Sequence, residues 1–367
     1  TTLKISPDGR YIAYAENDRG QYVVKVRSIE TRKETTILTH GSKVIGQEVD
    51  YRLPIIGWSD ANTLGVIAVS RGNYTFWLYD LSTKTKLPRE LDRFNNVRSI
   101  SFSANGRLAV LSADYEGKND LYLISSRRDR IRRLTNDIYD DLDPSFIPNT
   151  NKIVFSSNRP SDSLQAKRNT SLSELTDNHN LFVFDLDSTK TNAQRITNTL
   201  SKDFSPIALN SNTFYYLSDQ RGIINLFKYE RSSSIYTQVT NFATSIKEYD
   251  FNIENGTFAM VTNRRMRDEI YLNRNFNLNK QIFTPATRRK ELQQARVIKE
   301  KRKQEENKNM SIRDLINARL KNAQTEDSVK VESTDTTSIK NDSTSVILSD
   351  TVKVKVDTLK PKPVEII

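Results

Sequence analysis

The sequence contains six similar segments, and this internal repetition limits the possible fold more than any other feature. Each segment has an apolar run, a tight turn, a second apolar run that ends in polar residues, and then an aromatic-rich run. The turns hold Gly, Asn or Asp, which accept a positive φ or bond to their own backbone. They lie at residues 6–9, 59–62, 103–106, 148–151, 210–212 and 254–256. Measured between equivalent turn residues, the intervals are 51, 46, 45, 61 and 44 residues.

The runs beside these turns have the composition of buried strands. Residues 65–69 and 214–217 are short and nearly uninterrupted apolar stretches, as strands between stacked sheets should be. A fourth, more polar run such as 132–135 suits an outer strand that faces water. About four short strands every 40–50 residues are the signature of β-propeller blades. The sequence therefore predicts an all-β protein, a six-bladed β-propeller of four-stranded antiparallel blades.

Two stretches carry a resemblance to a known repeat. Residues 6–14 read SPDGRYIAY, and residues 121–135 begin LYLI and end RLT. They resemble the repeat of TolB-type propellers, which also includes the propeller of prolyl-oligopeptidase-like peptidases. The resemblance covers about residues 1–284 and implies a bacterial cell-envelope protein, in the periplasm or at the outer membrane, with a role in protein contacts. The Pro-Asp-Gly phrase is intact only at residues 7–9.

The repeat predicts the domain organisation. We expect blades at about residues 1–45, 46–93, 94–140, 141–200, 201–244 and 245–284, a charged helical segment at 285–321, and a disordered linker or tail at 322–367. Within these regions, helix 311–320 has one apolar face and needs another domain to dock on. Residues 352–356 alternate Val and Lys, which fits either an edge strand or a plain linker.

The predicted propeller begins with an inner strand and ends with an outer one, so we expect no blade that joins the two ends of the chain. The chain starts at Thr1 without a signal segment, and we interpret it as a mature or excised piece of a longer protein. In that case, sequence upstream of Thr1 would supply another blade or the strand that closes the ring. The complete blade number, ring closure, neighbouring domains and oligomeric state do not follow from this sequence.

Arginines recur near the end of the second strand of most blades. In a propeller these loops open on the same face as the connections between blades, and those connections carry Asp and Glu. The candidate binding residues on this rim are Arg19, Arg71, Arg159, Arg221, Arg264, Asp143 and Asp203. Such a rim could grip a peptide end, a carboxylate or a phosphate. Salt bridges that fix each blade to the next are the alternative, and the repetition favours them.

The longest repeat interval contains an insertion at residues 160–178. Loops longer than 12–15 residues are usually either functional or disordered. The candidate contact residues are Leu164, Lys167, Arg168, Leu172 and Leu175, which could cover the rim or meet a partner. Plain disorder of the insertion is the alternative.

Signatures of catalysis are missing from the sequence. There is no cysteine and no Gly-x-Ser-x-Gly motif, and the two histidines, His40 and His179, fall in different blades. Calcium-loop, zinc and phosphate-loop patterns are also missing. The sequence therefore predicts no catalytic residue, no metal and no cofactor. It has no apolar stretch of 18 residues, so no transmembrane helix is predicted.

The formal net charge of +11 is spread along the chain. A diffuse positive surface attracts acidic proteins or anionic lipid headgroups, so peripheral membrane contact stays open. No nucleic-acid-binding module is recognisable, and nucleic acid is not a predicted partner.

These observations favour a non-catalytic propeller scaffold that binds protein or peptide partners in the bacterial cell envelope. The main alternative is the substrate-gating propeller of a larger peptidase whose catalytic domain lies outside this chain. A glycan- or lipid-binding module is a third, and it is weakened because Trp58 and Trp77 both fall in apolar strands. The sequence does not identify the ligand or partner.

Overall fold

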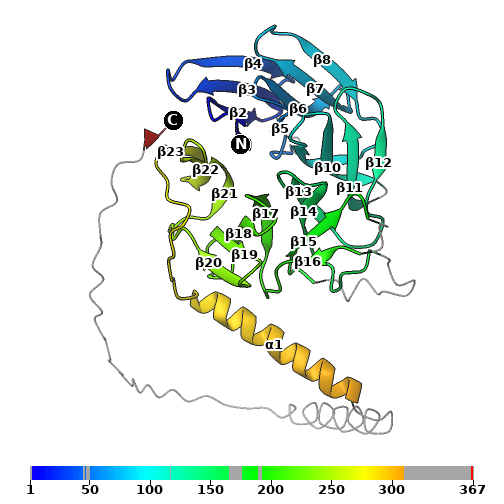
Figure 1. Cartoon of the computed structure of the whole chain (residues 1–367), viewed down its shortest axis with the longest axis vertical. Helices are drawn as coiled ribbons and strands as arrows, with labels where there is room; N and C mark the ends of the chain where they lie inside the picture. The colour runs from blue at the N-terminus through cyan, green and yellow to red at the C-terminus, as the bar shows by residue number, and fades with distance from the viewer. Residues whose placement is uncertain are drawn as a thin grey trace, which may run out of the picture. The chain divides into compact units, whose positions relative to one another are not determined.

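The computed structural model of this protein describes residues 2–43, 46, 50–115, 117–164, 176–188, 192–309 and 365–366. The strands form six four-stranded antiparallel sheets, arranged as the blades of a propeller around a central channel (Figure 1). This confirms the predicted fold class.

The strands of each blade follow one another in sequence. Blade 1 has β1 (Thr2–Ile5), β2 (Tyr11–Asp18), β3 (Gln21–Ser28) and β4 (Glu34–His40), and blade 2 has β5 (Ile55–Trp58), β6 (Thr63–Ser70), β7 (Asn73–Asp80) and β8 (Lys86–Glu90). Blade 3 has β9 (Asn96–Phe102), β10 (Leu108–Tyr115), β11 (Lys118–Ser125) and β12 (Ile131–Arg133), and blade 4 has β13 (Asp141–Phe146), β14 (Lys152–Ser157), β15 (Asn180–Asp185) and β16 (Gln194–Arg195). Blade 5 has β17 (Asp203–Ala208), β18 (Thr213–Ser218), β19 (Asn225–Glu230) and β20 (Ile235–Gln238), and blade 6 has β21 (Ile246–Asn252), β22 (Thr257–Arg264), β23 (Arg267–Asn273) and β24 (Glu365–Ile366).

This order gives the propeller two distinct faces. The inner strands β1, β5, β9, β13, β17 and β21 surround the channel. Because the strands alternate in direction, the turns between second and third strands lie on the same face as the connections between blades. We call this the upper face. The turns between first and second strands, and between third and fourth strands, lie on the opposite, lower face.

The hydrophobic core is divided among the contacts between neighbouring blades. Each pair of neighbours shares one buried apolar cluster, and together these clusters run around the ring. Blades 1 and 2 meet at Ala13 and Trp58, for example, and blades 3 and 4 meet at Val110 and Phe155. Fully burying a large apolar side chain stabilises a fold by about 1.5–3 kcal/mol, so the middle strands, buried on both faces, hold the ring together.

Blades 6 and 1 close the ring by packing, not by a shared sheet. Leu3 and Ala259 are fully buried in the cluster between these blades. The Ile5 amide donates to Asp250 Oδ2 at 2.7 Å, and Asn252 Nδ2 donates to the Pro7 carbonyl at 2.9 Å. In the described part of the chain, no blade combines strands from both ends. Strand β24 comes from the end of the chain and pairs with β23 as the outer strand of blade 6.

Helix α1 (Arg288–Asn309) follows strand β23 in the sequence. Its first turn is fixed to the propeller by an ion pair at 2.9 Å between Lys290 Nζ and Asp219 Oδ1. The chain divides into two compact units after Glu291, and the site described below lies in the first. The predicted helix at 311–320 and strand at 352–356 lie outside the described residues. No described helix has the length and apolar character needed to cross a bilayer.

Candidate functional site

The inner strands enclose a cavity of about 380 Å³ in the central channel. Two of these strands have equivalent irregularities, because Asp143 precedes Pro144 in β13 and Ser205 precedes Pro206 in β17. Asp143 and Ser205 have φ values of 50° and 49°, and the pairing register shifts at both positions. A β-bulge of this kind re-aims side chains, and both residues line the cavity.

Five charged residues line the channel: Lys4, Arg98, Asp143, Glu248 and Asp250. Two of the carboxylates have fixed hydrogen bonds. Asp143 Oδ2 accepts from the Ser205 amide at 3.1 Å and from its hydroxyl at 3.2 Å. Asp250 accepts from the Ile5 amide at 2.7 Å and from the Phe251 amide at 2.9 Å. These bonds hold neighbouring inner strands together. The other three charged residues of the lining, Lys4, Arg98 and Glu248, take no part in them.

Lys4 and Glu248 are half-buried, and neither has an ion pair within 4.0 Å among the described residues. Burial raises the pKa of Glu248 to about 7, while the charge of Lys4 lowers it and the charges of Asp143 and Asp250 raise it. Burial alone lowers the pKa of Lys4, but Asp250, Glu248 and Asp143 together raise it above its usual value. The channel therefore presents an ammonium group and a carboxyl group that titrates near neutrality.

Four of the predicted rim arginines lie on the upper face. Arg19, Arg71 and Arg264 are exposed at the turns of blades 1, 2 and 6. Arg221 is half-buried in blade 5, where its guanidinium lies 5.0 Å from the ring centre of Phe283. These residues come from four separate blades and surround the channel at a distance from one another.

The structure places Arg159 beneath the rim, with its side chain fully buried. Its Nη2 donates to both oxygens of Asp141 at 2.6 and 2.7 Å, and its Nη1 lies 3.1 Å from Asp137 Oδ2. Its guanidinium also lies 5.7 Å from the ring centre of Phe155 and 5.8 Å from that of Phe182. Arg159 is thus part of the blade framework, as in the salt-bridge alternative.

Asp203 is also fully buried. Its carboxylate accepts from the Ser218 hydroxyl at 2.6 Å and from the Thr199 hydroxyl at 2.8 Å. Burial raises the pKa of Asp203 to about 6 despite these hydrogen bonds. A carboxyl group enclosed in this way cannot meet a ligand on the rim, so Asp203 joins Arg159 in the framework.

Asp120, Asp137 and Asp141 form a buried cluster in which one oxygen of each lies within 4.8 Å of the others. The cluster contains the cations that neutralise it, because Arg159 pairs with Asp137 and Asp141, and Arg133 pairs with Asp120. Its residues fit a framework network better than a metal site. Sequence reasoning did not single out Asp120 or Asp137.

The signal that could have identified this network is a repeated polar pair. In blades 3, 4 and 5, a threonine that follows the fourth strand accepts a hydrogen bond from the amide of a leucine in the third strand. The same threonine hydroxyls donate to Asp120 within β11 and to Asn180 and Asn225, the first residues of β15 and β19. The threonines are Thr135, Thr197 and Thr240. A repeated hydroxyl clamp of this kind marks positions that build the blade.

Of the predicted insertion residues, only Leu164 lies in the described part of the chain. It is buried in the apolar cluster shared by blades 3 and 4, and the neighbouring Ser163 carbonyl accepts from Arg159 Nη1 at 3.2 Å. Lys167, Arg168, Leu172 and Leu175 lie outside the described residues. Leu164 therefore anchors the start of the insertion to the framework.

Comparison with known proteins shows the fold and no closer relationship. No protein-family model matches this sequence, and no curated protein sequence gives a significant match. The crystal structure of TolB from Acinetobacter baumannii is similar, with a TM-score of 0.55 and 15% identity over 74% of this chain and 63% of that one. A putative TolB from Agrobacterium tumefaciens has a TM-score of 0.52 and 16% identity over 70% of this chain and 86% of that one. The expected resemblance to TolB propellers is thus confirmed for the fold.

Proposed function

We propose that this protein is a non-catalytic propeller scaffold that binds a protein or peptide partner in its central channel. The observation that carries the proposal is the pair formed by Lys4 and Glu248, which are half-buried in the channel without a direct ion pair among the described residues. Burying a charge is costly unless a partner compensates it. A ligand group that enters the channel supplies such a partner.

An extended peptide segment fits this channel in size and chemistry. Its carboxylate groups would bind the Lys4 ammonium, and its amine groups would bind Asp143 or Glu248, in charge-assisted hydrogen bonds. Arg19, Arg71, Arg221 and Arg264 add positive charge around the mouth, which favours a partner with acidic residues beside the inserted segment. The walls are β-strands packed on both sides, so the site is preorganised.

The bacterial cell envelope is the location that we propose, because the repeat resembles that of TolB-type propellers. Two similar structures with TM-scores above 0.5 are TolB from Acinetobacter baumannii and a putative TolB from Agrobacterium tumefaciens. Fractionation of the source cells with an antibody against this chain tests the location, and recovery with cytosolic markers would contradict it.

Selection from a random peptide library tests the binding site. Peptides enriched on the wild-type protein should bind Lys4→Met and Glu248→Gln at least about tenfold more weakly, since each substitution removes a charge-assisted hydrogen bond. The matched controls are Lys33→Met and Glu30→Gln, at exposed residues of the lower-face turn in blade 1. Equal binding by the channel variants and the controls would refute the channel as the site.

The gating alternative makes a different prediction. If the propeller controls access to a peptidase domain, the protein encoded by the whole reading frame cleaves peptides, and the channel variants change its preference for substrate length. Peptide hydrolysis by the full-length protein would favour that alternative over the scaffold.

A further inference from the structure

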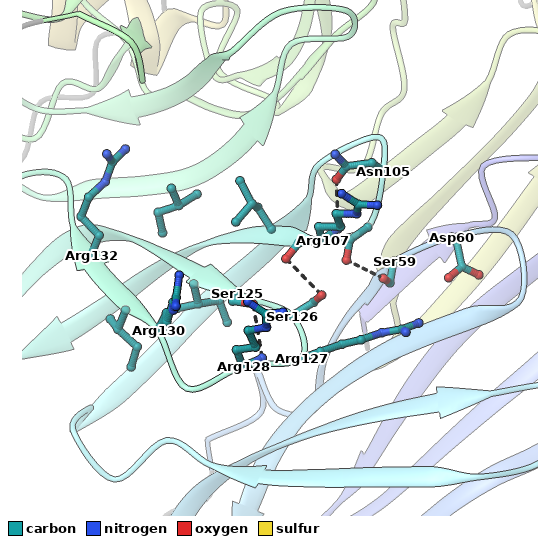
Figure 2. Close-up of a pocket in the computed structure, with 15 residues that line it drawn as sticks. Ser59, Asp60, Asn105, Arg107, Ser125, Ser126, Arg127, Arg128, Arg130 and Arg132 are labelled. Atoms are coloured by element: carbon teal, nitrogen blue, oxygen red, sulfur yellow. Dashed lines mark hydrogen bonds between the residues drawn. The ribbon is translucent and has the colours of Figure 1, made fainter.

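The lower face of blade 3 carries a second, separate site, which is a hollow of about 830 Å³ lined by five arginines. They come from the β9–β10 turn, the β11–β12 turn and strand β12 (Figure 2). The arginines are Arg107, Arg127, Arg128, Arg130 and Arg132, and all five are exposed. This hollow shares no lining residue with the channel cavity, so the proposed partner site does not explain it.

The charge of this hollow is poorly compensated. Asp60 is the one acidic residue among those lining it, which gives five positive charges against one negative, a net charge of +4. Asp129, in the same turn but outside the lining, reduces this to +3, and Asp80 offsets part of the charge of Arg127. None of the five guanidinium groups has a carboxylate within 4.0 Å in the part of the chain that the structure describes. Clustered like charges repel one another and concentrate counter-ions, which marks the hollow as a binding surface for anions.

The backbone beneath the arginines is held in place by hydrogen bonds. Arg89 Nη1 of blade 2 donates to the carbonyls of Ser125 and Arg128 at 2.7 and 2.6 Å. The Ser126 amide and hydroxyl both donate to the Arg107 carbonyl, at 2.9 and 3.1 Å. These bonds join the two turns that carry the arginines, as the dashed lines in Figure 2 show in part. The cations are therefore mounted on fixed turns, and binding does not require ordering a flexible loop.

Guanidinium groups, unlike the ammonium of lysine, form paired hydrogen bonds with planar carboxylates and with phosphates. A phosphomonoester carries about −1.5 to −2 charges at neutral pH, and a carboxylate carries one. Two phosphate groups therefore supply about −3 to −4, which matches the +3 to +4 of the hollow. An acidic peptide strand places alternate side chains on opposite faces, so it presents fewer charges per length to one surface.

We infer that the arginine hollow of blade 3 binds a ligand that carries two or more phosphate groups close together. The ligand is either a soluble polyphosphorylated compound or a phosphorylated lipid headgroup, since both present the same chemistry. The site functions independently of the channel, and the ligand tethers or orients the propeller through its lower face.

Titration calorimetry with inorganic tripolyphosphate tests the inference. The test variant is Arg127→Gln/Arg130→Gln, because neither side chain has a hydrogen bond or ion pair to a described residue. The control is Arg93→Gln/Lys202→Gln, which removes the same charge at exposed residues in connections between blades on the upper face. Tripolyphosphate should bind the wild type and the control with equal affinity. It should bind the test variant about tenfold or more weakly, because two charge-assisted contacts are lost.

Two further probes distinguish a lipid headgroup from a soluble ligand, and phosphate groups from carboxylates. Wild-type protein that binds phosphatidylcholine vesicles only when they contain phosphatidylinositol 4,5-bisphosphate, with binding lost in the test variant, supports a lipid headgroup. Tripolyphosphate binding without vesicle binding supports a soluble ligand. Tighter binding of poly-glutamate than of tripolyphosphate would overturn the phosphate assignment. The inference also fails if no probe binds saturably, or if the test variant behaves like the control. Thermal unfolding of both variants confirms that they are folded.

Discussion

Replacing Arg159 by methionine removes the cation between two buried carboxylates. In the wild-type protein Arg159 donates two short hydrogen bonds to Asp141 and pairs with Asp137 at 3.1 Å, and all three side chains are fully buried or nearly so. Removing one partner of a buried ion pair costs about 3–5 kcal/mol, because the remaining charge stays buried without compensation. Two carboxylates are left here, so we expect the free energy of unfolding to fall by about 3–5 kcal/mol at neutral pH.

The loss should depend on pH in a defined direction. Burial, and then the charge of Asp141, already raise the pKa of Asp137 to about 6 in the presence of Arg159. In the unfolded chain an Asp titrates near its ordinary value of about 3.9. The folded state therefore binds protons that the unfolded state has lost, and stability from this group falls as the pH rises from about 4 through 6. Without Arg159 the pKa rises further, so Arg159→Met should be less impaired at pH 5 than at pH 8.

Urea unfolding followed by far-ultraviolet circular dichroism measures both effects. The triple variant Asp137→Asn/Asp141→Asn/Arg159→Met removes the uncompensated charges and should recover at least half of the lost stability. Arg93→Met, at an exposed position, should change stability by no more than about 0.5 kcal/mol. The reasoning is refuted if Arg159→Met loses less than about 1 kcal/mol at neutral pH, or if the triple variant recovers nothing.

Three other predictions concern positions far from this network. Gly222→Ala should destabilise the protein by about 1–3 kcal/mol, because Gly222 has a φ of +92° and an added Cβ would lie 2.0 Å from Thr287 Oγ1. In thermal unfolding, adding Thr287→Gly should recover part of that loss. Glu248→Gln should flatten the decline in stability from about pH 4.5 to pH 7, because the pKa of Glu248 is raised to about 7, and urea unfolding at both ends of this range checks it. Deleting residues 365–367 should accelerate amide exchange along the outer edge of β23 while leaving the global stability within about 1 kcal/mol.

The fold could be predicted because its signals are local and repeated. Turn residues such as Gly9 and Gly106, both with positive φ, recur with apolar runs on either side, and each blade forms from consecutive strands. The outer strand of blade 6 is different, since 91 residues separate the end of β23 at Asn273 from the start of β24 at Glu365 and only two residues pair. No local pattern could indicate that pairing.

The candidate site was harder to predict, because the position of an arginine in the repeat does not determine whether its side chain is buried. Arg159 and Arg71 hold similar places in their blades, yet Arg159 is enclosed and Arg71 is exposed. The difference lies in the surroundings of Arg159, where Asp137 approaches from the connection that precedes its blade and Asp141 from β13, the first strand of the same blade. For the opposite reason, Lys4 was overlooked and Glu248 was not distinguished from the other acids in the connections between blades. They stand within inner strands, where charged side chains have no repeated pattern, and only the closed ring brings them to one channel.

The contrast between repeated and unrepeated residues separates framework from function in this propeller. The threonine clamp recurs in blades 3, 4 and 5, and its members are buried. The arginine hollow differs from the similar hollow of about 820 Å³ beside blade 1, which is lined by two arginines, two lysines and one glutamate and in which Arg10 pairs with Asp8. In the same turn of two other blades, residues 81–85 hold one lysine and residues 231–234 hold one arginine. A framework needs the same contact at every blade interface, whereas a ligand contacts one place. Charge that is concentrated in one blade, exposed and unpaired in the described structure, therefore points to recognition and not to blade construction.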